Sequence, residues 1–201
     1  MTKRLSGNLA DQIPTGHLDG TPQSGQTKRP EAEKVLNLKH AATSQHGQKG
    51  ITSRRQFLAP WRHPENLLIQ VTVHNRGPET ATIHLLPTLW FHNQWSWGSD
   101  SPRPIVEAIT NASAVRAVEP ELGEYRLFYD GEPTLLFTEN ETNMKRLFGG
   151  ENRTPFVKDA INDFCVHGQT NAVNPAMMGT KAAVHYCLQV APGKSAAEVM
   201  A

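Results

Sequence analysis

The amino-acid sequence predicts a mainly β protein, and three observations favour an antiparallel β-sandwich. Apolar and polar residues alternate with a period of two over residues 67–91, which is typical of strands that bury one face. About six to eight short segments of this kind are separated by Gly, Pro, Asn and Asp, as in sandwich proteins. A long Asn- and Asp-rich stretch, 139–174, interrupts the series and disfavours a closed barrel. We therefore expect a partial sandwich of the super-sandwich type, with a short helix and a disordered N-terminal tail.

The strands on either side of residues 75–79 are predicted to form a hairpin. Gly77 can adopt positive φ, and Pro78 has no N–H to donate to a ladder. The faces predicted to be buried carry Leu67, Ile69, Val71 and Val73 in the first strand and Ala81, Ile83, Leu85, Leu89 and Phe91 in the second. The faces predicted to contact water carry Gln70, Thr72 and His74 in the first strand and Thr80, Thr82, His84 and Thr88 in the second.

Further strands are predicted along the rest of the chain. A second hairpin is expected at Asp130-Gly131, because Asp-Gly favours tight turns between strands. The alternation predicts strands at 115–118, 124–129, 134–138, 181–190 and 195–200, and a strand or helical turn at 105–109.

Within residues 139–174 the spacing predicts one short helix. Phe156, Val157, Ala160, Ile161 and Phe164 are placed to share one side of it. Pro155 is suited to its first turn, because the N–H that proline lacks has no partner there.

Residues 1–55 are predicted to be a disordered or unrelated leader, and residues 56–201 the sandwich domain. The leader is rich in Gln, Lys, Gly, Thr, His and Ser, so it has too few apolar side chains to offset the entropy of ordering. At most a transient turn of helix is expected at 35–38.

Charge and hydropathy exclude several classes of partner. The net charge of +1 creates no strong field for nucleic acid or an anionic membrane, and no aromatic residue interleaves with the basic pairs of the leader. No apolar run is long enough to span a bilayer or to serve as a secretion signal. We therefore expect a cytoplasmic chain without a nucleic-acid or membrane partner.

No metal or cofactor is expected from the cysteine and histidine patterns. Cys165 and Cys187 lack metal-type spacing and are predicted to be reduced thiols in the core. The nine histidines form no recognisable ligand motif.

Two groups of residues are candidates for chemistry or recognition. Trp90, Trp95 and Trp97 either close one end of the sandwich or contact a ligand or partner domain, since indole rings stack well on sugars. Glycoside hydrolysis requires two carboxylates, and the chain offers Glu139 with Glu141, and Asp159 with Asp163. Acidic side chains in loops also commonly face water or form ion pairs, here with Lys145 or Arg146.

The sequence resembles bacterial proteins of glycoside hydrolase family 63. The resemblance runs from about Glu65 to Pro192 and is carried by VTVHNRGPETATIHLLPTLWFHNQWSWG, LGEYRLFYDG, LLFTENETNMKRLFG, PFVKDAINDFCVHG and AVNPAMMGTKAAVHY. Ala160 is a departure, because relatives commonly carry Gly there.

The resemblance implies a particular architecture and activity. Family members join an N-terminal β-sandwich to a larger (α/α)6 domain that hydrolyses α-glucosidic bonds with inversion. The chain then corresponds to part of the sandwich alone, so no catalytic residue is carried over, and segment 139–174 is expected to face the missing catalytic domain. The expected carbohydrate or interdomain contacts are Trp90, Trp95, Trp97, Asn140, Glu141, Asp159, Asn162 and Asp163.

Two other interpretations remain open at this stage. A free-standing carbohydrate-binding module would use Trp95, Trp97 and Asn140 to hold an oligosaccharide. A degenerate gene product would have no function at all.

Overall fold

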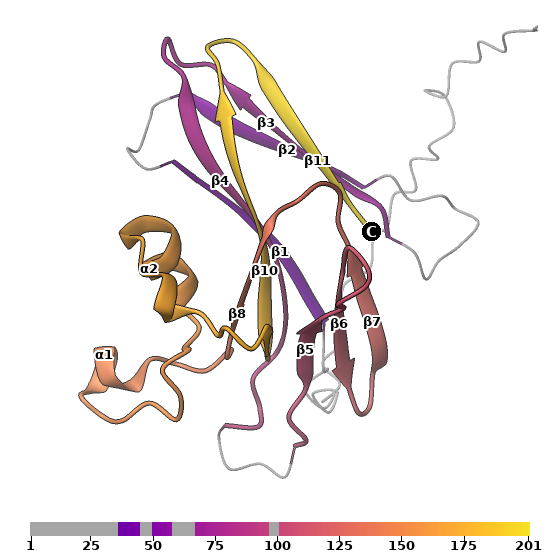
Figure 1. Ribbon diagram of the computed structural model, residues 1–201, viewed down its shortest axis with the longest axis vertical. Coiled ribbons are helices and arrows are strands. Elements are labelled where there is room, and N and C mark those ends of the chain that lie inside the picture. The colour runs from indigo at the N-terminus through magenta and orange to yellow at the C-terminus, as the bar shows by residue number, and fades with distance from the viewer. Residues whose placement is uncertain (1–35, 45–49, 58–66, 97–100) are drawn as a thin grey trace, which may run out of the picture. The chain divides into compact units, whose positions relative to one another are not determined.

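The computed structural model describes residues 36–44, 50–57, 67–96 and 101–201, which form antiparallel sheets and a few short helices (Figure 1). In sheet A the strand order is β1 (Leu36–Ser44), β4 (Ala81–Phe91), β10 (Lys181–Val190) and β8 (Thr134–Thr138). In sheet B the order is β11 (Ser195–Met200), β3 (Ile69–Asn75) and β2 (Ile51–Phe57). In sheet C the order is β7 (Gly123–Phe128), β6 (Ala114–Glu119), β5 (Ile105–Ala108) and β9 (Met178–Gly179).

Backbone hydrogen bonds join the edges of sheets B and C. The N–H of Phe128 donates to the carbonyl of Ala201 at 2.6 Å, and the N–H of Ala201 donates back at 3.1 Å. An antiparallel bridge between Tyr129 and Met200 continues this contact. Strands β7 and β11 therefore leave fewer unpaired backbone groups than free edges would.

All three sheets contribute to one hydrophobic core, which makes the fold a β-sandwich. The inward face of β4 supplies Ala81, Ile83, Leu85, Leu89 and Phe91, as the alternation predicts, and β3 supplies Ile69, Val71 and Val73. Sheet C adds Val106, Val115, Ala117 and Leu127 to the same cluster. The mainly β fold class is thus confirmed.

Both predicted hairpins are wrong. Strand β3 lies in sheet B and β4 in sheet A, so residues 75–79 carry the chain between sheets. The turn at Gly131, whose φ is 72°, likewise connects β7 of sheet C to β8 of sheet A. An alternating pattern specifies which face of a strand is buried, but strands in facing sheets bury the same kind of face.

The outer face of sheet A is covered by protein, which corrects the prediction that His84 lies on a face in contact with water. Helix α2 (Ala160–His167) covers this face, and its Ile161 and Cys165 pack with Leu86, Leu136 and Ala183. His84 is buried on the same face. The predicted helix exists but begins later than expected, so Pro155 lies outside it, and Gly168 ends it in the left-handed conformation.

The other helical segments are a five-residue helix, α1 (Met144–Phe148), and a single 3-10 turn, η1 (Thr170–Ala172). Within the part of the chain that is described, no helix is long and apolar enough to cross a membrane.

The expectation of an unrelated leader up to residue 55 needs correction. Strand β1 pairs with β4 from Leu36↔Phe91 to Ser44↔Ile83, where at most a turn of helix was expected. Strand β2 pairs with β3 from Ile51↔Asn75 to Phe57↔Ile69 and crosses the predicted boundary at 55. Backbone pairing to strands far along the chain leaves no mark in local composition. The disorder predicted for 1–35 falls outside the described residues.

A buried asparagine holds together two of the turns that connect sheets A and B. The side-chain amide of Asn75 donates to the carbonyls of Glu79 and Val190, both at 2.7 Å, and its Oδ1 accepts from the N–H of Gly77 at 2.9 Å. Its backbone N–H donates to Lys194 and its carbonyl accepts from Gly193. The β3–β4 and β10–β11 connections are therefore fixed to each other through one residue.

Replacing Asn75 should destabilise the whole fold. In Asn75→Ala the carbonyls of Glu79 and Val190 lose their donor, and we expect the free energy of unfolding to fall by about 2–4 kcal/mol. Asn75→Asp should also destabilise, because an ionised carboxylate donates no hydrogen bond. Urea denaturation measures both effects, and Asn162→Ala, at an exposed position of α2, should change little. A fully stable Asn75→Asp variant would contradict this role.

Candidate functional site

Several predicted site residues meet where β4 and β8 end. The side chain of Asn140 donates to the carbonyl of Phe91 at 2.9 Å, and its own carbonyl accepts from the side chain of Asn93 at 2.9 Å. The N–H of Asn140 donates to the hydroxyl of Thr180 at 2.8 Å. Asn140 thereby ties together the ends of β4, β8 and β10.

Trp95 closes this end of the sandwich. Its ring is half-buried and packs against the main core, and its indole N–H donates to Oε1 of Glu141 at 3.2 Å. Arg153 lies 3.8 Å from the same carboxylate oxygen. An indole that is packed on one side and hydrogen-bonded at its N–H is a structural plug rather than an open stacking surface.

The other two tryptophans are placed differently. Trp90 is half-buried on the outer face of sheet A, opposite Lys181 of β10. Trp97 falls outside the described residues. The structure therefore brings Trp95, Asn140 and Glu141 together but does not add Trp90 to that group.

Glu139 is a buried carboxylate with two partners. It forms an ion pair with Arg103, and its Oε2 accepts from the hydroxyl of Thr180 at 2.8 Å. Glu139 and Glu141 are thus each held by a neighbouring donor, which is the usual condition of buried acids with a structural role.

An open pocket of about 410 Å³ lies beside Glu139. Its wall includes Arg103, Arg153, Phe156 and Met178. The hydroxyl of Thr154, also in the wall, is buried without a hydrogen-bond partner. A polar ligand with a hydroxyl group would suit this combination of guanidinium, carboxylate and hydroxyl groups.

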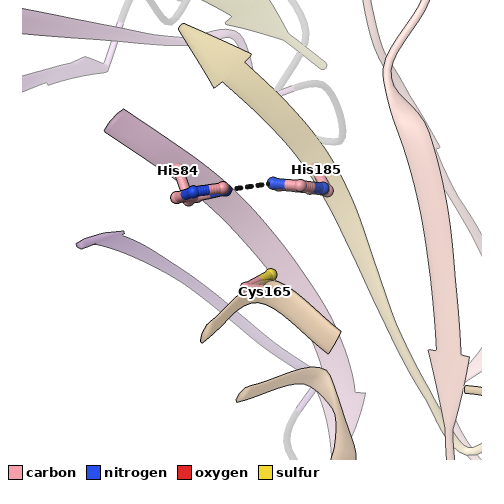
Figure 2. A group of neighbouring side chains, drawn as sticks. All are labelled: His84, Cys165 and His185. Atoms are coloured by element: carbon pink, nitrogen blue, oxygen red, sulfur yellow. Dashed lines mark hydrogen bonds between the residues drawn. The ribbon is translucent and has the colours of Figure 1, made fainter. Parts of the chain in front are cut away.

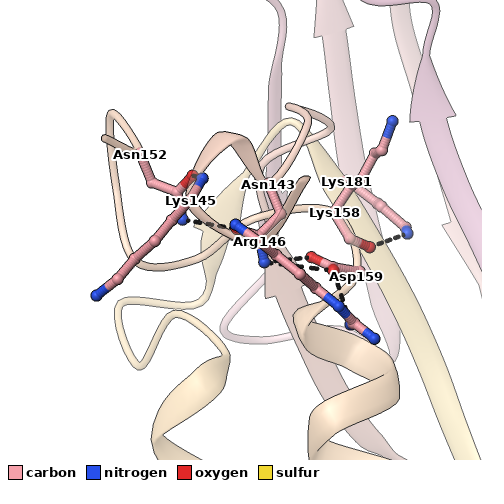
Figure 3. A network of polar contacts seen from close by, with 7 residues as sticks. All are labelled: Asn143, Lys145, Arg146, Asn152, Lys158, Asp159 and Lys181. Carbon is pink, nitrogen blue, oxygen red and sulfur yellow. Dashed lines mark hydrogen bonds and ion pairs between the residues drawn. The ribbon is translucent and has the colours of Figure 1, made fainter. Parts of the chain in front are cut away.

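Asp159 belongs to a separate polar network around α1 (Figure 3). Its carboxylate accepts from the side chain of Asn143 at 3.2 Å and from Nη1 of Arg146 at 3.1 Å. Asn143 in turn accepts from the side chain of Asn152 at 3.0 Å. The predicted partner of Asp159, Asp163, contributes its backbone carbonyl to the end of α2, and Asn162 is exposed on that helix. The two predicted carboxylate pairs therefore do not form one catalytic group.

Lys181 lies beside this network and is unusual among the lysines described. Its ammonium group donates to the backbone carbonyl of Lys158 at 2.7 Å. Burial and, after it, the positive charge of Lys158 lower the pKa of Lys181 to about 8, although the charge of Asp159 acts in the opposite direction.

A third group, which the sequence patterns did not reveal, lies under α2 (Figure 2). His84 of β4, His185 of β10 and Cys165 of α2 are all buried, and one potential ligand atom of each lies within 4.8 Å of the other two. This geometry corrects the interpretation that cysteine and histidine form no constellation. Cys165 is a buried thiol as predicted, whereas Cys187 is exposed. One sequence feature could have revealed this group. Leu86 and Ala183 are apolar although they lie on the face predicted to contact water, which indicates that a further element covers that face.

Comparison with known proteins gives one relative and no family assignment. The chain is similar to an uncharacterized protein of Saccharomyces cerevisiae, YMR196W, with 29% identity over 159 residues. The matched region covers 66% of this chain but only 15% of the yeast protein. No family model and no solved structure matches the chain.

If Glu139 is structural, it should be energetically coupled to Arg103. We expect Glu139→Gln and Arg103→Gln to be non-additive, with a coupling free energy of about 1–2 kcal/mol in a double-mutant cycle measured by urea denaturation. The exposed pair of Arg126 and Glu124 is the matched control and should show a much smaller coupling. Additive effects at Glu139 and Arg103 would contradict the ion pair.

Lys181 should react with amine-specific reagents at unusually low pH. Labelling followed by peptide mass spectrometry should show a midpoint near pH 8 for this residue. Asp159→Asn should move the midpoint lower, because it removes a charge that favours the ammonium form. At a pH between the folded-state and the unfolded-state pKa of Lys181, the unfolded chain binds more protons than the folded chain. The contribution of Lys181 to stability therefore rises with pH in this range. A midpoint near 10.5 would refute the burial of this amine.

Proposed function

We propose that this chain is the non-catalytic β-sandwich of a glycoside hydrolase of the α-glucosidase type, and that it supports a separate (α/α)6 catalytic domain. The resemblance to glycoside hydrolase family 63 in segments from about Glu65 to Pro192 motivates the proposal. The two-sided β core is compatible with a sandwich of this kind. The yeast relative is a much longer protein, as expected for a relative that carries further domains.

The observation that carries the proposal is an exposed apolar surface on α1. Leu147 is 60% exposed and Phe148 is 70% exposed, and Met144 of the same helix is exposed as well. None of the five residues of α1 is buried. This helix lies within segment 139–174, where the resemblance places the contact with the catalytic domain. Adjacent exposed Leu and Phe side chains are typical of an interface that a partner covers.

The acidic residues support a non-catalytic role for the chain itself. Glu139, Glu141 and Asp159 are each engaged by arginine, hydroxyl, indole or amide groups of the chain. An inverting glycosidase instead needs two carboxyl groups facing each other across a space that holds the sugar and a water molecule. The catalytic acid and base are therefore assigned to the partner domain.

The alternative of a free-standing carbohydrate-binding module is less well supported. Its main candidate, Trp95, is packed against the core and is hydrogen-bonded to Glu141. If that alternative holds, titration with maltose should give saturable quenching of tryptophan fluorescence that Trp95→Ala weakens.

The proposal is tested with a family 63 α-glucosidase from which its own sandwich has been removed. Supplied in trans, this chain should bind the truncated enzyme and raise its activity on 4-nitrophenyl α-glucoside, while the chain alone should give no turnover. Phe148→Glu should weaken binding at least about tenfold, because it places a charge in an apolar contact.

The matched control is Phe128→Glu, at another exposed phenylalanine that lies on β7 of sheet C. This variant should bind like the unmodified chain. Hydrolysis by the isolated chain, or equal binding by both glutamate variants, would overturn the proposed function.

A further inference from the structure

The buried histidine pair has more hydrogen-bonding capacity than its protein neighbours use. Nδ1 of His84 and Nε2 of His185 are 2.7 Å apart, and the two rings lie edge to edge with centroids 5.0 Å apart and an angle of 16° between their planes. One of these nitrogens must donate and the other accept, so the contact uses one nitrogen of each ring. The remaining nitrogens, Nε2 of His84 and Nδ1 of His185, are buried without a partner.

The facing nitrogens of the two rings offer a buried pair of potential metal ligands. The two histidines are only 7% and 8% exposed, and Phe164 lies edge-on to His185 with ring centroids 6.0 Å apart. Imidazole nitrogens are common ligands of transition metals.

Cys165 provides a sulfur on the side of the pair that faces α2 (Figure 2). Its sulfur and one nitrogen from each histidine fall within 4.8 Å of one another. The three side chains come from β4, α2 and β10, which are far apart in the sequence. We propose that His84, Cys165, His185 and Cys187 form a zinc site that fastens α2 to the outer face of sheet A.

Cys187 is assigned to the fourth position by the strand register. It follows His185 by two residues on β10, so the two side chains project from the same face of the sheet. It is also directly opposite His84 in the β10–β4 pairing. Side chains in such pairs have Cβ atoms about 4.5–5.5 Å apart.

The donor set matches the preferences of zinc. Two imidazoles and two thiolates are a common tetrahedral set for structural zinc. Zn–N bonds of about 2.0–2.1 Å place two nitrogen ligands about 3.3 Å apart, so the rings must separate by about 0.6 Å from their present contact. Both thiols lose a proton on binding, and the two thiolates neutralise the charge of the ion.

An ion at this position would join strands β4 and β10. Pairing between β10 and β4 is interrupted between Ala183↔Thr88 and Tyr186↔Leu85, where β4 carries Pro87. Proline has no N–H to contribute to the ladder. His185 lies within this interruption and His84 lies just beyond it, so an ion bound to both would join the strands where their backbone pairing is weakest.

The test uses the full chain, first treated with EDTA and kept in a phosphine reductant so that both cysteines remain thiols. Addition of Zn²⁺ should give one bound ion per chain by elemental analysis. At a hundred times its dissociation constant, Zn²⁺ should raise the Tm by about 5–10 °C. Co²⁺ in its place should show sulfur-to-metal charge transfer and the intense visible bands of tetrahedral coordination.

Variants identify the ligands. Cys165→Ser and His84→Gln should each weaken Zn²⁺ binding at least about tenfold, with far-ultraviolet circular dichroism confirming that both variants are folded. Cys187→Ser should reduce the charge-transfer intensity that its thiolate contributes. His74→Gln, on β3 in sheet B, is the matched control and should bind like the unmodified chain.

Absence of stoichiometric zinc in the folded chain would overturn the site, as would Co²⁺ spectra without a sulfur band. Binding that survives in the combined His84→Gln and Cys165→Ser variant would also overturn it. An unchanged spectrum in Cys187→Ser would overturn the fourth ligand. None of these outcomes depends on the proposed glycosidase role, because the test measures metal binding without a partner domain.

Discussion

The buried amide of Asn75 is the interaction on which the sandwich depends most. The β3–β4 and β10–β11 connections both pass between sheets A and B, and the backbone and side chain of this residue hydrogen-bond to both of them. Sheet packing alone is adjustable, because apolar contacts have little directionality. A side chain with two donors and one acceptor all engaged fixes the alignment of the two sheets more strictly. Val71 and Ile83, from the two strands that Asn75 helps to join, are thereby held in one core.

At the opposite end of β4, polar residues also fix the positions of neighbouring strands through hydrogen bonds. Asn140 links three strand ends, and Glu139 and Glu141 receive donors from the surrounding loops. The side chains of the Asn- and Asp-rich segment thus form hydrogen bonds with irregular backbone, whose polar groups have no partners in a helix or sheet. The segment carries α1 at the surface through the contacts of Asn143 and Asn152.

The alternation of apolar and polar residues correctly predicted features that depend on neighbouring residues, namely strand bounds and buried faces. Strands β10 and β11 have the predicted bounds, and the inward residues of β4 are those that the alternation indicates. The placement of β3 and β4 in different sheets could not be predicted, because facing sheets bury identical patterns. His84 appeared solvated because the sequence around it does not identify the helix that covers it, which begins 76 positions later, at Ala160. The meeting of His84, Cys165 and His185 depends on the same long-range packing, so spacing rules for metal motifs could not find it.

Both ends of helix α1 are capped by contacts within the chain. Oδ1 of Asn143 accepts from the N–H of Arg146 at 3.0 Å, and Gly149 ends the helix in the left-handed conformation with φ 69°. A one-turn helix is unstable by itself, so these end contacts hold Phe148 in a single presentation. A partner that covers α1, as proposed above, would contact a preorganised Phe148 side chain, and little conformational entropy would be lost on binding. Recognition at this surface should therefore resemble rigid docking rather than coupled folding.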